Sequence, residues 1–142
     1  MSPALILDTG VLLWMSQGSG YLGPRTRAMI EEADEGGSLS FSAVSMLEVA
    51  RLHEDGRIDL RRAPELWHRE LTDRGVREIP VTAEMALLAA ALESREGFHA
   101  DPADQMIAAT AIVARRQLVT SDRKILHWAT GRTEPDCLDA RT

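Results

Sequence analysis

Cysteine is almost absent from this sequence, since Cys137 is the only one among 142 residues. One thiol excludes an intramolecular disulfide and a metal site built from several cysteines, and it favours a reducing compartment. No run of about 18 apolar residues occurs, and Asp8 interrupts an apolar start that no basic residue precedes, unlike a signal peptide. We therefore expect a soluble, cytoplasmic protein with no membrane span.

Positive charge is also scarce. The chain has 16 Lys and Arg residues against 22 Asp and Glu residues, which gives a formal net charge of -6. This balance argues against a protein that coats nucleic acid with a basic surface. The positive residues are 15 arginines and Lys124, and arginine is the better bidentate phosphate ligand. The composition is therefore compatible with a nucleic-acid enzyme that has an acidic centre and a local cationic path.

Aromatic residues make up only 4% of the chain. Trp14, Trp67 and Trp128 lack the alternation of basic and aromatic residues that is typical of single-strand binding. We expect them to pack in the core or at an interface. Trp14 lies in an apolar segment, residues 12–15, that is a candidate interface surface.

The sequence does contain enough apolar material for a core. Hydrophobic residues are 44% and charged residues 27% of the chain, which are ordinary values for a globular protein. A length of 142 residues suits one core, so we expect a single domain over residues 1–142.

Short apolar runs alternate with longer helical patterns. The expected strands are residues 4–7, 39–44, a stretch around 79–81, and 118–120 as the last strand. The expected helices begin at Pro24, Ser45, Pro64, Thr82 and Asp101, and the last of them reaches about Arg116. Residues 8–10 indicate a turn, followed by a glycine-rich loop. This alternation predicts an α/β fold in which a parallel sheet lies between helices.

Four acidic residues fall near the expected carboxyl ends of strands, where open parallel sheets bind ligands. Asp8 directly follows the first strand and Asp122 follows the last. Glu48 lies in the first turn of the second helix, about 200 degrees around it from Met46 and so away from the apolar stripe. Asp104 lies in the first turn of the helix that begins at Asp101. We expect these four acids to share one edge of the sheet.

Each acid also has an ordinary structural interpretation. Asp8 suits a turn, Glu48 suits a capping box with Ser45, and Asp122 suits the start of a terminal turn. Asp101 suits a helix cap, with Asp104 favoured by the helix dipole. Taken one at a time, these interpretations are at least as good as the functional one.

The four acids together favour a metal site. At about 5 Å and an effective dielectric constant of 20, each pair of like charges costs on the order of 3 kcal/mol, which a divalent cation would offset. Ligation by oxygen alone suits Mg2+ or Mn2+ rather than zinc. One or two such ions at Asp8, Glu48, Asp104 and Asp122 would support hydrolysis of a phosphodiester without a nucleophilic side chain.

Four segments, in their order and spacing, resemble the PIN-domain family, and in particular the VapC ribonuclease toxins of toxin–antitoxin pairs. The segments are residues 5–9, 42–50, 99–111 and 118–122. The resemblance implies a three-layer α/β/α fold, an endoribonuclease that uses Mg2+ or Mn2+, a homodimer, and a small antitoxin protein that blocks the site.

By position, the family's four acidic roles fall to Asp8, Glu48, Asp104 and Asp122, and Asp8 and Asp104 are the firmest metal ligands. Asp101 is a possible further oxygen donor, although capping is the favoured role. Gln105 stands where many relatives carry arginine.

Several cationic residues are candidates for phosphate contacts. Arg123 is favoured because it neighbours Asp122, whereas Arg115, Arg116 and Lys124 are weaker candidates. His99 stands just before Asp101 and is more simply interpreted as a structural loop residue.

Two other functions compete. A phosphatase with Asp8 as nucleophile would carry an Asp-x-Asp-Gly motif, but Gly10 occupies the place of the second aspartate. A non-catalytic PIN-fold binding protein would act only through an interface, and the presence of all four acids argues against it.

Overall fold

The computed structural model describes residues 3–142. Its five strands form one sheet in the order β3-β2-β1-β4-β5, and each neighbouring pair is parallel. The strands are β1 (Leu5–Leu7), β2 (Leu39–Ser42), β3 (Arg77–Ile79), β4 (Gln117–Thr120) and β5 (Cys137–Asp139). The expected parallel sheet is confirmed. The expectation that residues 118–120 form the last strand is wrong, because β5 follows and pairs with β4 at the edge.

The helices were only partly predicted. They are α1 (Thr9–Ser16), α2 (Pro24–Glu35), α3 (Val44–Glu54), α4 (Pro64–Asp73), α5 (Ala83–Glu96), α6 (Pro102–Val113) and α7 (Arg123–Ala129). The five expected helices are present, with boundaries shifted by a few residues. None of them is long and apolar enough to cross a membrane in the described part of the chain.

Helix α1 corrects the expectation of a turn and loop after the first strand. The carboxylate of Asp8 accepts a hydrogen bond of 2.8 Å from the backbone N–H of Val11 and so caps the helix. Residues 10–15 are almost uniformly apolar, so they show no helical periodicity, although the cap and the buried position of Leu12 favour a helix. Asp8 therefore sits at the exact junction of β1 and α1.

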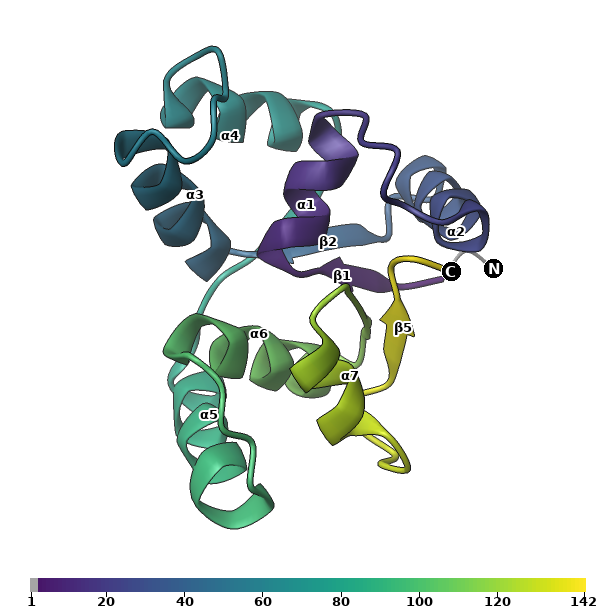
Figure 1. Ribbon diagram of the computed structural model, residues 1–142, viewed down its shortest axis with the longest axis vertical. Helices are drawn as coiled ribbons and strands as arrows, with labels where there is room; N and C mark the ends of the chain where they lie inside the picture. Colours follow the sequence, from purple (N-terminus) through teal and green to yellow (C-terminus); the bar gives the residue numbers. More distant parts are fainter. Residues whose placement is uncertain (1–2) are drawn as a thin grey trace.

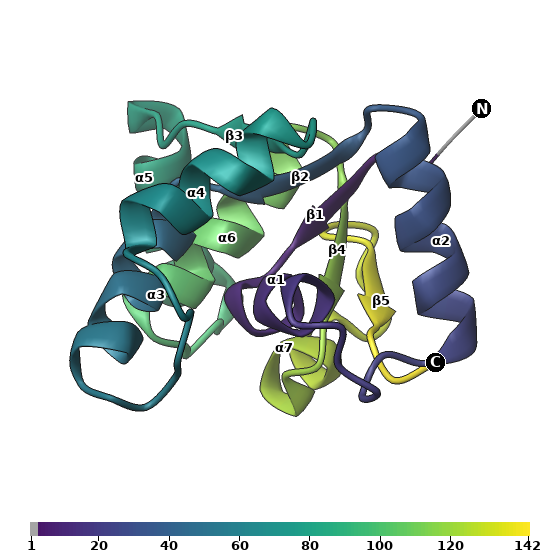
Figure 2. The ribbon, with the colours of Figure 1, turned by 90° about the horizontal axis from the view of Figure 1, so that it is seen from above.

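The sheet separates two helical layers (Figure 1). Helices α1, α2, α3 and α4 cover one face, where side chains such as Leu12, Ile30, Val49 and Trp67 pack on Leu5 and Leu7 of β1. Helices α5, α6 and α7 cover the other face. In Figure 2, α4 lies in front of the β2 and β3 side of the sheet, and α1 is seen nearly end-on near the end of β1. The predicted three-layer α/β/α arrangement is confirmed.

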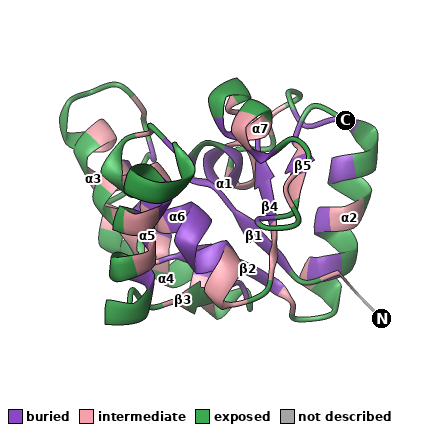
Figure 3. Cartoon of the chain, turned by 90° about the horizontal axis from the view of Figure 1, so that it is seen from below, coloured by how far each residue is buried: buried purple, intermediate pink, exposed green. Residues whose placement is uncertain are grey.

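The central strands are buried on both faces, as expected for a parallel sheet. All three residues of β1 and all four of β2 are buried, and Figure 3 shows these strands and much of α6 in the buried class. The buried hydroxyl of Ser40 donates to the carbonyl of Leu5 at 2.6 Å, so this polar side chain in the core keeps a partner. This hydrogen bond adds a side-chain link between β2 and β1.

Only two residues of the apolar segment after β1 remain candidates for an interface surface, because Leu12 and Leu13 lie in the core. Leu12 is 0% exposed and Leu13 is 8% exposed, because both lie on the side of α1 that faces the sheet. Trp14 and Met15 are half-buried against the same core. Trp67 is buried in that core, as expected.

Candidate active site

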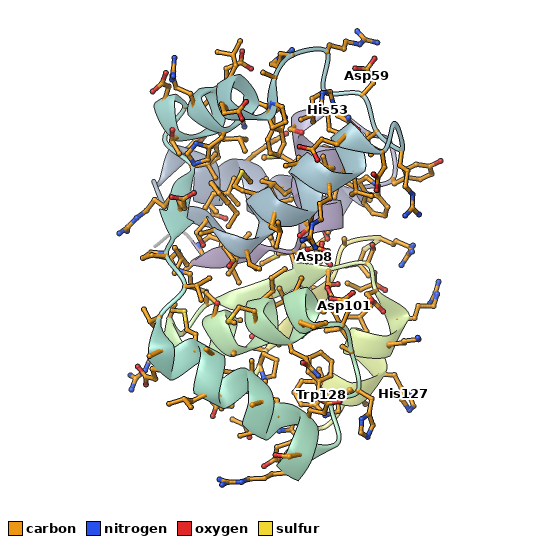
Figure 4. The ribbon with its side chains drawn as sticks, turned by 90° about the vertical axis from the view of Figure 1, so that its left-hand side faces the viewer. Asp8, His53, Asp59, Asp101, His127 and Trp128 are labelled. Carbon is orange, nitrogen blue, oxygen red and sulfur yellow. The ribbon has the colours of Figure 1, made fainter. Side chains whose placement is uncertain are left out.

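The site forms where the parallel strands end. Strand β1 lies between β2 and β4, so the chain leaves β1 towards one edge of the sheet and later crosses to the other. Open parallel sheets bind ligands at such a reversal, outside the carboxyl ends of the strands. Asp8 follows β1 and Asp122 lies two residues after β4. In Figure 4, Asp8 and Asp101 lie where the two helical layers meet.

Both carboxylate oxygens of Asp8 are held in place. Oδ1 accepts the hydrogen bond from Val11, and Oδ2 accepts one of 2.5 Å from the hydroxyl of Thr120 on the neighbouring strand. The backbone N–H of Asp8 donates to the carbonyl of Val119. Asp8 is only 6% exposed, so its carboxylate has a fixed orientation at the floor of the site.

Glu48 is linked to the residue after Asp8. The hydroxyl of Thr9 donates to Glu48 Oε1, and Thr9 and Ser45 share a hydrogen bond of 2.9 Å between their hydroxyl oxygens. The interpretation of Ser45 and Glu48 as a capping box is wrong, because Ala43 is the N-cap of α3 and makes no side-chain capping bond. Glu48 is instead positioned by α1, which brings it towards Asp8.

Asp101 and Asp104 share the start of α6. Asp101 Oδ1 accepts a hydrogen bond of 2.9 Å from the backbone N–H of Asp104, so the predicted cap is confirmed. Asp104 is half-buried. Within residues 3–142, no side-chain hydrogen bond or ion pair fixes its carboxylate, which is therefore the least restrained of the four acids.

Asp122 caps α7 and is connected to Asp8 through Thr120. Asp122 Oδ1 accepts from the backbone N–H of Lys124 at 2.8 Å, and the backbone N–H of Asp122 donates to Thr120 Oγ1 at 3.1 Å. The hydroxyl of Thr120 thus accepts a hydrogen bond from the backbone of Asp122 and donates one to the carboxylate of Asp8. This arrangement couples the position of Asp122 to that of Asp8.

The electrostatics show that the predicted acids are brought together. Burial, as the largest cause, and the negative charges of neighbouring acids together raise the pKa of Asp104 to about 8; in decreasing order these neighbours are Asp101, Glu48, Asp122 and Asp8. The pKa of Asp8 is raised to about 6, chiefly by burial and in smaller part by the charges of Asp122 and Glu48, against the hydrogen bonds from Thr120 and Val11.

The pKa of Glu48 is raised as well, mainly by burial and in smaller part by Asp101, against the hydrogen bond from Thr9. Three of the four acids therefore hold protons more strongly than free carboxyls do. Such a set favours a positive charge at its centre.

The donor chemistry of this cluster fits a divalent cation. Its side chains offer carboxylate oxygens alone, the ligands that Mg2+ and Mn2+ prefer. Among residues 3–142, no three acidic, histidine or cysteine side chains already stand in position to ligate a common ion. The carboxylates would have to move closer to share one, and the unrestrained Asp104 is the side chain best able to do so.

The cationic residues are distributed unevenly around the cluster. Arg123 is exposed at the start of α7, beside Asp122. Arg115 and Arg116 lie at the far end of α6, where Arg116 donates to the carbonyl of Ser38 ahead of β2. A 12-residue helix, about 18 Å long at 1.5 Å per residue, separates these arginines from Asp104, so they do not border the acids.

Sequence reasoning missed the hydroxyl groups and one arginine at the site. Thr9, Ser45 and Thr120 connect the acids, and Arg141 donates from Nη1 to the carbonyl of Ser121 at 2.7 Å. Thr9 and Thr120 adjoin acids in the sequence, which is a weak signal. Arg141 gives none, because only the pairing of β5 with β4 brings it near Ser121.

Another cavity, of about 560 Å3, lies away from these acids. It is a mostly apolar groove between α3 and α4 lined by residues such as Met46, Val49 and Trp67, and none of the four acids lines it. The acid cluster and this groove are therefore separate features of the structure.

Comparisons with known proteins agree with this geometry. A family model described as the PIN domain matches residues 5–130. Ribonuclease VapC22 of Mycobacterium tuberculosis is 38% identical over 121 residues, which cover 85% of this chain and 88% of the relative.

Solved structures share the fold. A toxin–antitoxin complex from Klebsiella pneumoniae matches with a TM-score of 0.62 and 20% identity, over 96% of this chain and 97% of that one. VapBC2 from Rickettsia felis, bound to a DNA fragment from its promoter, matches with a TM-score of 0.67 and 13% identity, over 95% and 97% of the two chains.

Proposed function

The chain belongs to the PIN-domain family and, within it, to the VapC ribonucleases, and from this premise we propose that it is a metal-dependent endoribonuclease that serves as the toxin of a toxin–antitoxin pair. The observation that carries the proposal is the cluster of Asp8, Glu48, Asp104 and Asp122 at the carboxyl edge of the sheet, together with the raised pKa values of its members.

Each acid would contribute in its own way. Asp8, held by Val11 and Thr120, would present its carboxylate in a fixed direction as the first cation ligand. Asp104 would complete the site by moving towards Asp8, and Glu48 and Asp122 would flank them. When bound, Mg2+ or Mn2+ supplies Lewis-acid stabilisation of phosphate charge and makes a coordinated water more acidic.

The chain's own residues would also manage protons. With a pKa of about 8, the Asp104 carboxyl holds a proton at neutral pH when no cation is present, and cation binding would release it. Arg123, beside Asp122, would contact a phosphate of the RNA strand. No side chain needs to form a covalent bond with phosphorus.

A phosphatase mechanism with Asp8 as nucleophile is less well supported. Such phosphatases carry an Asp-x-Asp-Gly motif, and here Gly10 stands in the place of the second aspartate. A purely binding protein would have no need for a costly cluster of like charges.

The partners proposed are RNA as substrate, a small antitoxin protein, and a second copy of the chain in a homodimer. The antitoxin is supported by the family and by a solved protein of this fold that is a toxin–antitoxin complex. The homodimer rests on the family resemblance. Light scattering of the isolated chain, and co-purification with the product of the adjacent reading frame, test these two partners separately.

The function itself is tested by incubating RNA with the protein in Mg2+ or Mn2+, in EDTA, and in EDTA followed by excess cation. We expect cleavage with the cation, none in EDTA, and recovery on adding it back. Sequencing the new RNA ends would then define the target. Cleavage that persists in EDTA would contradict the proposed chemistry.

A further inference from the structure

A second cavity, of about 450 Å3, lies beside the acid cluster on the side of α7. We call it the α7 cavity, and its lining residues are Gly97, Phe98, His99, Lys124, His127 and Trp128. Figure 4 shows His127 and Trp128 on the same side of the molecule as Asp8 and Asp101. None of the four acids lines it, so it is a separate feature with a different charge.

Two segments that carry acids also carry basic residues that line this cavity. His99 lies two residues before Asp101, and Lys124 lies two residues after Asp122. Lys124 and His127 are three positions apart on α7, so their side chains project from the same side of the helix. The cavity is therefore bordered by one lysine and two histidines immediately next to the acids.

Lys124 and His127 are available for a ligand. Both are exposed, and within residues 3–142 neither side chain forms a hydrogen bond or an ion pair. The imidazole of His99 is partly engaged, because its Nδ1 lies 3.8 Å from Glu93 Oε1. Lys124 is also the only lysine of the sequence.

The walls of the cavity are held rigidly. Phe98 and Trp128 stack with ring centroids 4.1 Å apart, and the guanidinium of Arg132 lies 4.3 Å from the Trp128 ring. These contacts occupy both faces of that ring, so it is not a platform for a base. Gln105 Nε2 donates to the carbonyl of Phe98 at 3.1 Å, which fixes the loop that carries His99.

We propose that the α7 cavity binds a phosphate of the RNA strand next to the phosphate that is cleaved, through Lys124 and His127. This inference rests on the proposed ribonuclease function. A strand that crosses the acid cluster carries further phosphates, and carboxylates repel them. The α7 cavity offers these phosphates the unpaired ammonium of Lys124, the imidazole of His127 and a preformed wall beside the acids.

The single lysine allows a direct test on the unaltered protein. Acetylation of Lys124 is measured by mass spectrometry in EDTA, so that RNA binds without being cut, and the amino-terminal amine serves as internal reference. We expect single-stranded RNA to slow acetylation of Lys124 and not of the reference amine. Equal rates with and without RNA would overturn the proposal, as would protection by polyglutamate alone, which would indicate an acidic protein segment as the ligand.

Substitutions give a second, quantitative test. For single-stranded RNA, Lys124→Gln should make the plot of log affinity against log salt concentration less steep by about 0.7, the contribution of one phosphate contact. Over the tenfold range from 1 M to 0.1 M salt, this difference corresponds to about fivefold weaker binding at 0.1 M. Lys124→Arg should restore most of it. The matched control is Arg77→Gln, which removes an exposed charge at the amino end of β3, away from the acids. Equal slopes for Lys124→Gln and Arg77→Gln would overturn the proposal.

Cleavage kinetics separate this proposal from the proposed function. For a long RNA, kcat/KM of Lys124→Gln should fall about fivefold, whereas a dinucleotide with one phosphate should be cleaved as by the unaltered chain. If no RNA is cleaved at all but Lys124 is still protected, the proposed function fails and the cavity assignment stands. If RNA is cleaved and Lys124→Gln behaves as Arg77→Gln does, the cavity assignment alone fails.

Discussion

The hydroxyl of Thr120 donates a hydrogen bond to Oδ2 of Asp8 across two neighbouring parallel strands. The same hydroxyl accepts from the backbone N–H of Asp122. A neutral side chain thus holds two of the acids in position and stabilises the charged form of Asp8. The cluster depends on this support as well as on the acids themselves.

Replacing Thr120 should therefore weaken cation binding without removing a ligand. Thr120→Val keeps the shape but loses the hydroxyl, and we expect affinity for Mn2+ to fall by about 10- to 100-fold, the usual effect of losing a group that orients a ligand. Isothermal titration calorimetry measures it. Thr110→Val is the matched control, because Thr110 is also buried but donates to the carbonyl of Met106 in α6. Equal losses in the two variants would contradict the role of Thr120.

The raised pKa values predict how stability depends on pH. Between about pH 4 and pH 8, native Asp8 and Asp104 keep protons that the unfolded chain has released, since their pKa values are about 6 and about 8. Stability of the cation-free protein must then fall as pH rises through this window. Thermal melts in EDTA at pH 5 and pH 8 should show this fall, and Asp104→Asn should reduce it.

The control for those melts is Asp73→Asn, an exposed position at the end of α4. Asp73→Asn should keep the pH dependence of the unaltered chain. A protein in EDTA that is as stable at pH 8 as at pH 5 would show that the native carboxyls are not shifted upward.

Cation binding should release protons. Because Asp104 is largely protonated below its pKa of about 8, affinity for Mn2+ should rise between pH 6 and pH 8 and then level off. Calorimetry at pH 7 in buffers of different ionisation enthalpy gives the number of protons released. We expect a clear release for the unaltered chain and less for Asp104→Asn, whereas no release in either would contradict protonation of Asp104.

The role of Asp101 can be separated from that of the acids proposed to bind the cation. Asparagine is as good an N-cap as aspartate, so Asp101→Asn should keep the stability of α6, whereas Asp101→Ala should cost about 1 kcal/mol. If Asp101 only caps the helix, Asp101→Asn should change Mn2+ affinity by no more than about threefold. Loss of a residue that merely orients a metal ligand would already lower the affinity by about tenfold or more. Chemical denaturation and calorimetry check the two effects. A loss of affinity as large as that of Asp104→Asn would identify Asp101 as a ligand.

Much of the fold followed from local sequence patterns. The apolar run at Leu5–Leu7 and the caps at Thr82 and Asp101 predicted their elements, because burial and capping leave short-range signals. Helix α1 was missed because Val11 to Met15 has no polar face to reveal a period. Strand β5 was missed because three residues at a sheet edge carry too little pattern.

The acids of the site were predictable because local sequence patterns also mark where strands end. Asp8 follows β1 directly and Asp122 lies two residues after β4, so the topology of a parallel sheet places them at the same edge. Their hydroxyl partners were not predictable, since the link between Thr9 and Glu48 joins residues 39 positions apart. That contact exists only after β1 and β2 pair and α3 packs beside α1.

The most direct test of the account is the Mn2+ affinity and RNA cleavage of Asp8→Asn and Asp104→Asn, measured beside Asp73→Asn after circular dichroism has shown that all three fold. We predict that each of the first two variants loses at least about 100-fold in both quantities, since it removes a ligand rather than an orienting group, while Asp73→Asn matches the unaltered chain. Cleavage or Mn2+ binding that survives in both Asp8→Asn and Asp104→Asn would contradict the assignment of this cluster as the metal centre of a ribonuclease.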